Sequence, residues 1–225
     1  MEASGVMVIW HSGDAVIRST LLCLLTMGLA SWSLLLLRLR DQNRVLRAAR
    51  AAAASFWLSP NLHDAVQRLN RASPFRTVIE AGLGAREQHR DVLAGQIALA
   101  DRVTARMERS VESVGKRLES GLELVASMAA TAPWVGLFGT VWGTYTALAA
   151  LSAPGPETMQ VIAGPVGRSL MMTGFGLAVA VPVLLAHRWV VRRNALAMST
   201  LREFSLDARA VLLNGPGTRR EPEVA

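Results

Sequence analysis

Four hydroxyl side chains lie at helical spacing in two apolar stretches of the chain. Thr140 and Thr144 are four residues apart in the charge-free stretch 124–156, and Ser169 and Thr173 repeat that spacing further along. A hydroxyl both donates and accepts hydrogen bonds and carries no charge. One interpretation is that each hydroxyl donates only to a carbonyl of its own helix. Two such pairs on two glycine-rich helices favour a polar seam that lines a shared interior.

Glycines mark one side of the first of these helices and recur in the second. Gly136, Gly139 and Gly143 are three and four residues apart, and the second stretch contains Gly174 and Gly176. Small residues at such spacing let helix backbones approach one another closely in lipid. We expect these five glycines to be helix-packing residues.

Motifs of common enzymes and metal sites are missing from the sequence. It contains no phosphate-binding GxxxxGK[ST] loop, no GxSxG and no HExxH. The four histidines have no metal-ligand spacing relative to each other or to Cys23, the single cysteine. We therefore predict a protein that is not an enzyme and that holds no cofactor or metal.

Long charge-free stretches place the chain in a membrane. Hydrophobic residues make up 51% of it, and its mean hydropathy is +0.30. The stretches 19–37, 124–156 and 169–187 can each cover a hydrocarbon core of about 30 Å as a helix. We predict an all-α polytopic membrane protein with three transmembrane helices and long helical cytoplasmic extensions. Residues 1–17 contain no Lys or Arg, which argues against a cleaved signal peptide.

The distribution of arginine predicts the orientation. The formal net charge is +7, but arginines cluster directly after the first and third spans. Positive charge marks cytoplasmic flanks, so the basic balance indicates topology, and nucleic-acid binding is not expected. The predicted parts are an outer N-terminal segment (1–14), transmembrane helices (15–37, 128–152 and 161–190), a cytoplasmic helical region (38–127), an outer loop (153–160) and a cytoplasmic tail (191–225).

An apolar stripe runs along the cytoplasmic region that precedes the second span. Its residues recur every three or four positions, which is typical of one helix face. We predict one long helix that rises from the cytoplasm into the membrane, unless Gly115 or Gly121 bends it. The stripe is either a seam between subunits or, more commonly, an intramolecular core. Its members are Val103, Met107, Val111, Val114, Leu118, Leu122 and Val125.

Two segments in the second and third spans read TAPWVGLFGTVWGTYTAL and GPVGRSLMMTGFGLAVAVPVLLAHRWVVRRN. They resemble the MotA/TolQ/ExbB proton-channel family, most closely its ExbB branch. The resemblance implies a homopentameric ring of three-span subunits in a bacterial inner membrane. The outer N-terminus predicted from the arginines is then periplasmic. The resemblance also implies two partners: an ExbD-like single-span protein whose membrane aspartate carries the proton, and a TonB-like protein that reaches the outer membrane.

The family's pore threonines correspond to Thr140 and Thr173 in this sequence. The resemblance thus implies that both hydroxyls face the partner's carboxylate, which they can hydrogen-bond in either protonation state. ExbB-like sequences usually carry a glutamate five residues before the second threonine, where this chain has Arg168. A charge in a span is costly unless it is paired, faces a cavity or extends to the interface. Arg168 is therefore either a functional charge of the pore or a side chain that reaches the outer interface.

Four other functions are considered for a chain with these spans. A TolQ-like subunit that serves envelope integrity would share the three spans. A non-conducting membrane scaffold is the rival from another class, because a fixed charge such as Arg168 near the pore repels protons. A MotA-like flagellar stator would be expected to have four spans. A secondary transporter would be expected to show an inverted repeat and broken helices, which three spans do not provide.

Overall fold

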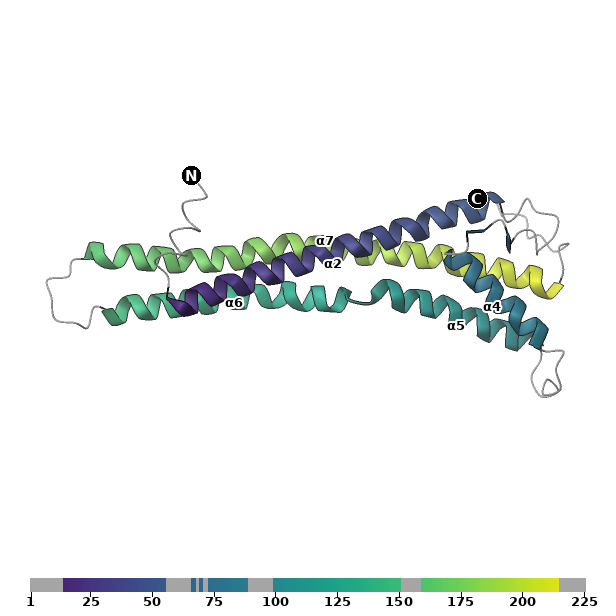
Figure 1. Cartoon of the computed structure of the whole chain (residues 1–225), viewed down its shortest axis with the longest axis horizontal. Helices are drawn as coiled ribbons and strands as arrows, with labels where there is room; N and C mark the ends of the chain where they lie inside the picture. The colour runs from purple at the N-terminus through teal and green to yellow at the C-terminus, as the bar shows by residue number, and fades with distance from the viewer. Residues whose placement is uncertain are drawn as a thin grey trace, which may run out of the picture. The chain divides into compact units, whose positions relative to one another are not determined.

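The chain folds into long helices (Figure 1). A computed structural model describes residues 14–55, 66–67, 69–70, 73–88, 99–150 and 159–214. No strand occurs among these residues, and three helical stretches are long and apolar enough to cross a membrane, which confirms the predicted all-α membrane fold. The helices are α2 (Ala15–Ser55), α4 (Pro74–Gln88), α5 (Leu99–Glu119), α6 (Leu122–Ala150) and α7 (Met159–Asn214).

Two helices contain both a predicted span and the basic segment that follows it. Helix α2 has 41 residues and α7 has 56, whereas about 20 residues suffice to cross a hydrocarbon core. Each helix therefore continues beyond its span into the predicted cytoplasmic region. The predicted outer segment and loop, apart from Asp14 and residues 159–160, lie outside the described residues, as does the tail beyond Asn214.

The helix expected to rise unbroken into the membrane is interrupted. Ser120 and Gly121 form a turn between α5 and α6, and Gly121 has a φ of 79°. This left-handed conformation is strained for residues with a Cβ, so glycine is the residue that ends a helix in this way. The prediction of one continuous helix is wrong, and its stated exception at Gly121 is correct.

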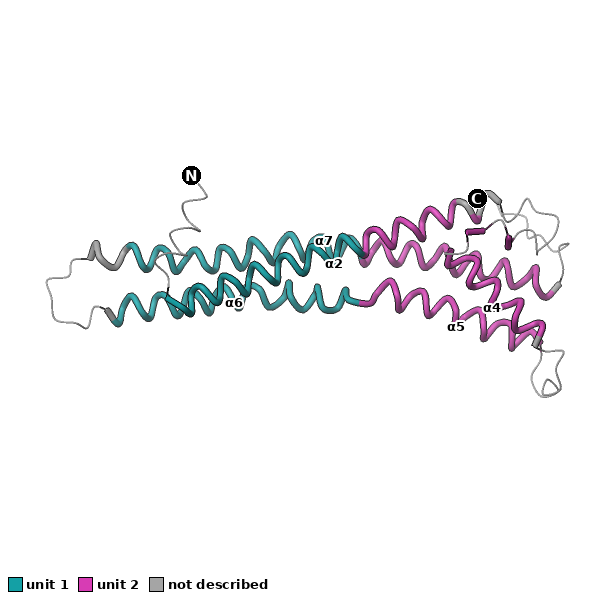
Figure 2. Tube along the Cα trace, viewed as in Figure 1, with its two compact units in different colours: residues 1–37, 121–190 teal, residues 38–120, 191–225 magenta. Residues whose placement is uncertain are grey.

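The chain divides into two compact units, shown in Figure 2. Unit 1 comprises residues 1–37 and 121–190, and unit 2 comprises residues 38–120 and 191–225. Each unit has an apolar cluster of its own.

The core of unit 2 answers the question raised by the apolar stripe. Val103, Met107 and Val111 of α5 are buried inside the unit, in one cluster with residues of α2, α4 and α7. Phe75 of α4 and Phe204 of α7 pack edge to face within it, with ring centroids 5.0 Å apart. In unit 2 the stripe is therefore an intramolecular core, the second of the two interpretations.

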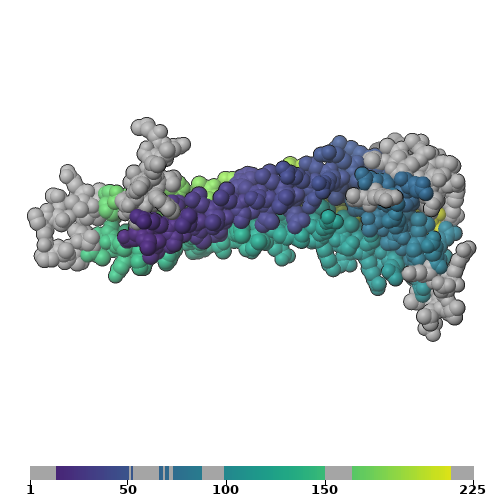
Figure 3. All heavy atoms as spheres, in the orientation of Figure 1, coloured from purple at the N-terminus to yellow at the C-terminus, as the bar shows by residue number. Residues whose placement is uncertain are grey.

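Unit 1 packs the membrane-spanning parts of α2, α6 and α7 around a smaller cluster. The space-filling view shows the side chains of α2 lying on those of α6 (Figure 3). Within this contact the buried hydroxyl of Ser31 donates to the sulfur of Met128, at 3.4 Å. Many large apolar side chains of the unit point outward, among them Leu29 and Trp134, each 70% exposed. Such a surface suits lipid or other membrane helices.

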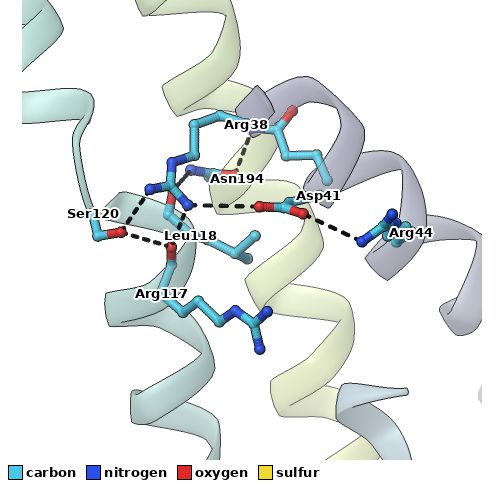
Figure 4. Close-up of polar contacts among 8 residues, drawn as sticks. Arg38, Asp41, Arg44, Arg117, Leu118, Ser120 and Asn194 are labelled. Atoms are coloured by element: carbon cyan, nitrogen blue, oxygen red, sulfur yellow. Dashed lines mark hydrogen bonds and ion pairs between the residues drawn. The ribbon is translucent and has the colours of Figure 1, made fainter. Parts of the chain in front are cut away.

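A polar cluster in unit 2 caps the end of α5 (Figure 4). The last carbonyls of a helix have no partner in that helix, and here side chains from α2 and α7 supply one. Arg38 of α2 donates to the carbonyl of Arg117 at 3.2 Å and to the hydroxyl of Ser120 at 2.9 Å. Asn194 of α7 donates to the carbonyl of Leu118 at 3.0 Å.

A buried amide pair completes this cluster. Gln42 donates to the side-chain oxygen of Asn194 at 2.5 Å, and the two residues are 0% and 4% exposed. Asn194 thus bonds both Gln42 and the backbone of α5. Removing a buried partner costs the desolvation of each group left behind, so Asn194 should matter more to stability than its size suggests.

The first prediction concerns Asn194. Replacing it with Ala leaves the Leu118 carbonyl and the Gln42 amide without this partner, and should cost about 1–3 kcal/mol for each group not reached by water. The measurement is thermal unfolding of the full chain in detergent. Ser199→Ala is the control, because Ser199 is exposed and, within the described part of the chain, its hydroxyl bonds only the Leu196 carbonyl of its own helix. Equal unfolding temperatures for the two variants would contradict a stabilising cluster.

Candidate functional site

The backbones of α6 and α7 touch at Gly136 and Gly176. A Cβ added at Gly136 would lie 2.7 Å from the carbonyl oxygen of Met172, and one added at Gly176 would lie 2.8 Å from that of Ala132. Real Cβ atoms do not approach oxygen so closely, so only glycine permits this contact. The two helices pack in the small-residue manner expected of membrane helices.

The other glycines singled out in the sequence differ in their surroundings. A Cβ at Gly139 would lie 3.1 Å from Thr20 of α2. One at Gly143 would lie 2.6 Å from the Cβ of Ser169 on α7. Gly174 does not fit the expected packing role within the chain, because it is exposed and a Cβ there would meet no described atom within 4 Å. Two residues turn a helix by about 200°, so Gly174 lies on nearly the opposite side of α7 from the buried Gly176.

The close contact brings the predicted pore threonines together. The hydroxyl oxygens of Thr140 on α6 and Thr173 on α7 are 2.5 Å apart, and either can donate. The Thr140 hydroxyl also lies 3.1 Å from the carbonyl of Ser169 and 3.2 Å from that of Gly136. Both threonines are half-buried. The Thr140 hydroxyl is therefore surrounded by hydrogen-bonding groups of this same chain.

A second hydroxyl pair lies one helical turn away. Thr144 and Ser169 are joined by a hydrogen bond of 3.0 Å between their hydroxyls. Each also has a carbonyl acceptor in its own helix, Thr140 for the first and Val166 for the second, both at 2.8 Å. Thr140, Thr144 and Ser169 thus have acceptors in their own helices, as the first interpretation predicts, but hydroxyls also bond between α6 and α7, which that interpretation does not include. That the seam lines a shared interior stays a prediction.

The seam formed by these four hydroxyls carries no charge. Its residues are Thr140, Thr144, Ser169 and Thr173. No group of three or more His, Cys, Asp or Glu residues suited to a metal occurs in the part of the chain that the structure describes. An uncharged hydroxyl can donate to a carboxylate and accept from a carboxylic acid, so the seam suits a group that changes its protonation state.

Arg168 lies apart from the threonine pair. It precedes Thr173 by five residues, which turns it about 140° around an α-helix. Its side chain runs back along α7, so that a guanidinium nitrogen would be 3.7 Å from a Cβ at Gly164. That group is then about 13 Å along the helix from Thr173. Arg168 is half-buried and forms no hydrogen bond or ion pair with another described residue.

Comparison with known proteins now identifies the family. The sequence profile of the MotA/TolQ/ExbB proton channel family matches residues 70–203, more than half of the chain. The chain belongs to this family. The match includes both helices of the hydroxyl seam, so the resemblance drawn from their two sequence segments is confirmed.

Named members of the MotA/TolQ/ExbB family align over most of the chain. Biopolymer transport protein ExbB of Xanthomonas campestris pv. campestris (strain B100) is 30% identical over 217 residues, which cover 92% of this chain and 86% of the relative. The protein of the same name from Neisseria meningitidis serogroup A is 29% identical over 212 residues, with coverages of 92% and 96%. Tol-Pal system protein TolQ of Haemophilus influenzae is 29% identical over 194 residues, with coverages of 80% and 82%.

Proposed function

We propose that the chain is an ExbB-like stator subunit of a bacterial inner membrane. With an ExbD-like single-span partner it would use the proton-motive force to energise outer-membrane transport through a TonB-like protein. The observation that carries the proposal is the half-buried pair of hydroxyls at Thr140 and Thr173, in a seam without charge. Family membership and the ExbB names of the relatives at 29–30% identity support it.

In this proposal the seam forms part of the path of the proton. Five copies of the chain would form a ring in which α6 and α7 face the partner, and each copy would contribute one threonine pair. The partner's aspartate loses its charge when it takes up a proton, and the threonines can bond both of its forms. Because the seam adds no fixed charge, it does not hold the carboxylate in one form.

The TolQ-like alternative has support of its own. A relative named for the Tol-Pal system aligns over 80% of the chain at 29% identity. Such a subunit would share the seam and would differ in the protein that it drives. The non-conducting scaffold is the alternative that the following substitutions separate from both.

Thr140→Val and Thr173→Val test the proposed role. Valine keeps the shape of threonine and removes the hydroxyl, so each variant should assemble and should lose about tenfold in proton flux for each ~1.4 kcal/mol of lost stabilisation. The measurement is proton flux into proteoliposomes that contain the chain and its co-expressed single-span partner. Thr146→Val is the control, because among the described residues the Thr146 hydroxyl bonds only the Gly143 carbonyl of its own helix. Wild-type flux in all three variants would contradict the proposal.

The proposed orientation places the N-terminus in the periplasm and the C-terminus in the cytoplasm. It rests on the arginines that follow the first and third spans. In a Cys23→Ser background, a membrane-impermeant thiol reagent added to intact cells should label Gly155→Cys and not Ser113→Cys. Ser113 is exposed on α5, so a lack of labelling there reports its side of the membrane and not burial. Labelling of Ser113→Cys in sealed cells would reverse the assignment.

A further inference from the structure

Arginines bracket two spans at the same separation. Arg18 and Arg38 enclose the charge-free residues 19–37 of α2, and Arg168 and Arg188 enclose residues 169–187 of α7, which contain no Lys, Arg, Asp or Glu. Each pair is 20 residues apart (38 − 18 and 188 − 168). In an α-helix that separation is about 30 Å, the thickness of a hydrocarbon core. Arg168 thus has the position of an outer boundary residue and not of a charge in mid-membrane.

The outer arginines lie at the same depth in unit 1. Contacts at Gly143 fix this layer, because a Cβ there would lie 2.6 Å from Ser169 and 3.4 Å from Ile17. Arg168 and Arg18 are the sequence neighbours of those two residues.

A second contact in the same unit confirms the parallel register of α2 and α7. Gly28 lies against Val179, with 3.4 Å from a Cβ at Gly28 to a methyl of the valine. The offset between the contacting residues is 151 (179 − 28), and between Arg18 and Arg168 it is 150 (168 − 18). The two arginines are therefore level to within about one residue rise of 1.5 Å.

The Arg168 side chain points away from the middle of the span. Its guanidinium lies beside Gly164, which is about 6 Å closer to the N-terminal end of α7 than Arg168 itself. Gly164 and Gly167 are both exposed, and a Cβ at Gly167 would meet no described atom within 4 Å. The charged group thus extends along an open surface toward the end of the helix, as arginines do when they reach a polar interface from an apolar helix.

Aromatic side chains flank the same layer on α6. Trp142 precedes Gly143, and Tyr145 follows it by two residues with a ring centroid 6.2 Å from that of Trp142. Tyr145 is 64% exposed, and the buried indole N–H of Trp142 has no hydrogen-bond partner among the described residues. Tryptophan and tyrosine are enriched where hydrocarbon meets the headgroups. Their place beside the arginine layer indicates that this layer is a membrane boundary.

We propose that Arg168, level with Arg18, binds the phosphate groups of phospholipids in the outer leaflet. A guanidinium offers several N–H donors that fit phosphate oxygens, and no described acid competes for Arg168. A carboxylate of a partner helix is the other anion of interest. A carboxylate bonded to Thr140 and Thr173 would lie about 13 Å along α7 from the guanidinium, so one group cannot satisfy both sites. The lipid site does not depend on proton conduction.

Depth measurement of spin labels tests the layer directly. Gly167→Cys and Gly174→Cys, each in a Cys23→Ser background, place a nitroxide at positions where the structure leaves open space. The full chain is reconstituted in vesicles of phosphatidylethanolamine and phosphatidylglycerol, and depth is read from relative accessibility to oxygen and to a water-soluble nickel complex. The label at 167 should lie at the level of the phosphates, and the label at 174 about 10 Å deeper. Equal depths, or a label at 167 inaccessible to both reagents, would overturn the proposal.

Lipids without phosphate test the ligand. In phospholipid bilayers Arg168→Gln should lower the unfolding temperature by about 3 °C, Arg168→Lys should lower it less, and neither should change it in galactosyl diacylglycerol bilayers. Arg202→Gln is the control, with the same charge change on an exposed residue of α7 beyond its span. A loss with Arg168→Gln that is equal in both lipids would overturn the proposal. A loss that appears only with the co-expressed partner would overturn it in favour of a partner carboxylate.

Discussion

Helices α6 and α7 come together at Gly136 and Gly176 until each backbone lies against the other. A methyl group at either glycine would come within 2.8 Å of a carbonyl oxygen of the facing helix. Within lipid there is little hydrophobic gain from joining helices, so close van der Waals contact and polar bridges hold them together. The hydroxyls of Thr140 and Thr173 are short, and they reach each other because the backbones are this close.

Polar groups at the end of α5 also need hydrogen-bond partners. The helix stops at the turn of Gly121, so its last carbonyls have no donor in α5. Arg38 from α2 and Asn194 from α7 donate to these carbonyls instead. A charged donor serves where the cluster is partly exposed, and neutral amides serve where it is buried. Unit 2 thus gains cross-links between three helices at the place where one of them ends.

The sequence pattern predicts the helices better than it predicts the contacts between them. Charge-free stretches and their arginine flanks predicted three long apolar helices, because hydropathy and length depend on one segment at a time. The spacing of Thr140 and Thr144 showed that they lie near each other on one helix. Periodicity does not tell which face of α7 that helix meets, so the bond between Thr140 and Thr173 required the structure.

The residues that sequence reasoning missed had a weaker signal. Asn194 falls in the series Val190, Asn194, Ala197 and Leu201, whose spacing of four, three and four marks a buried face. An amide on such a face points to a buried partner, but the sequence does not say that the partner is Gln42. The sequence offers Gly115 and Gly121 as two places where the helix could bend. Only the structure shows that Gly121, with a φ of 79°, is the residue that ends α5.

A double-mutant cycle on Thr140 and Thr173 tests most directly whether the hydroxyl seam is a bond within one subunit. The free energies of unfolding of Thr140→Val, Thr173→Val and the double variant are measured in one detergent, and the coupling energy is their departure from additivity. The account predicts a favourable coupling of about 0.5–1.5 kcal/mol, which should disappear in a Gly176→Ala background that forces the helices apart. Additive effects in the wild-type background would contradict the seam.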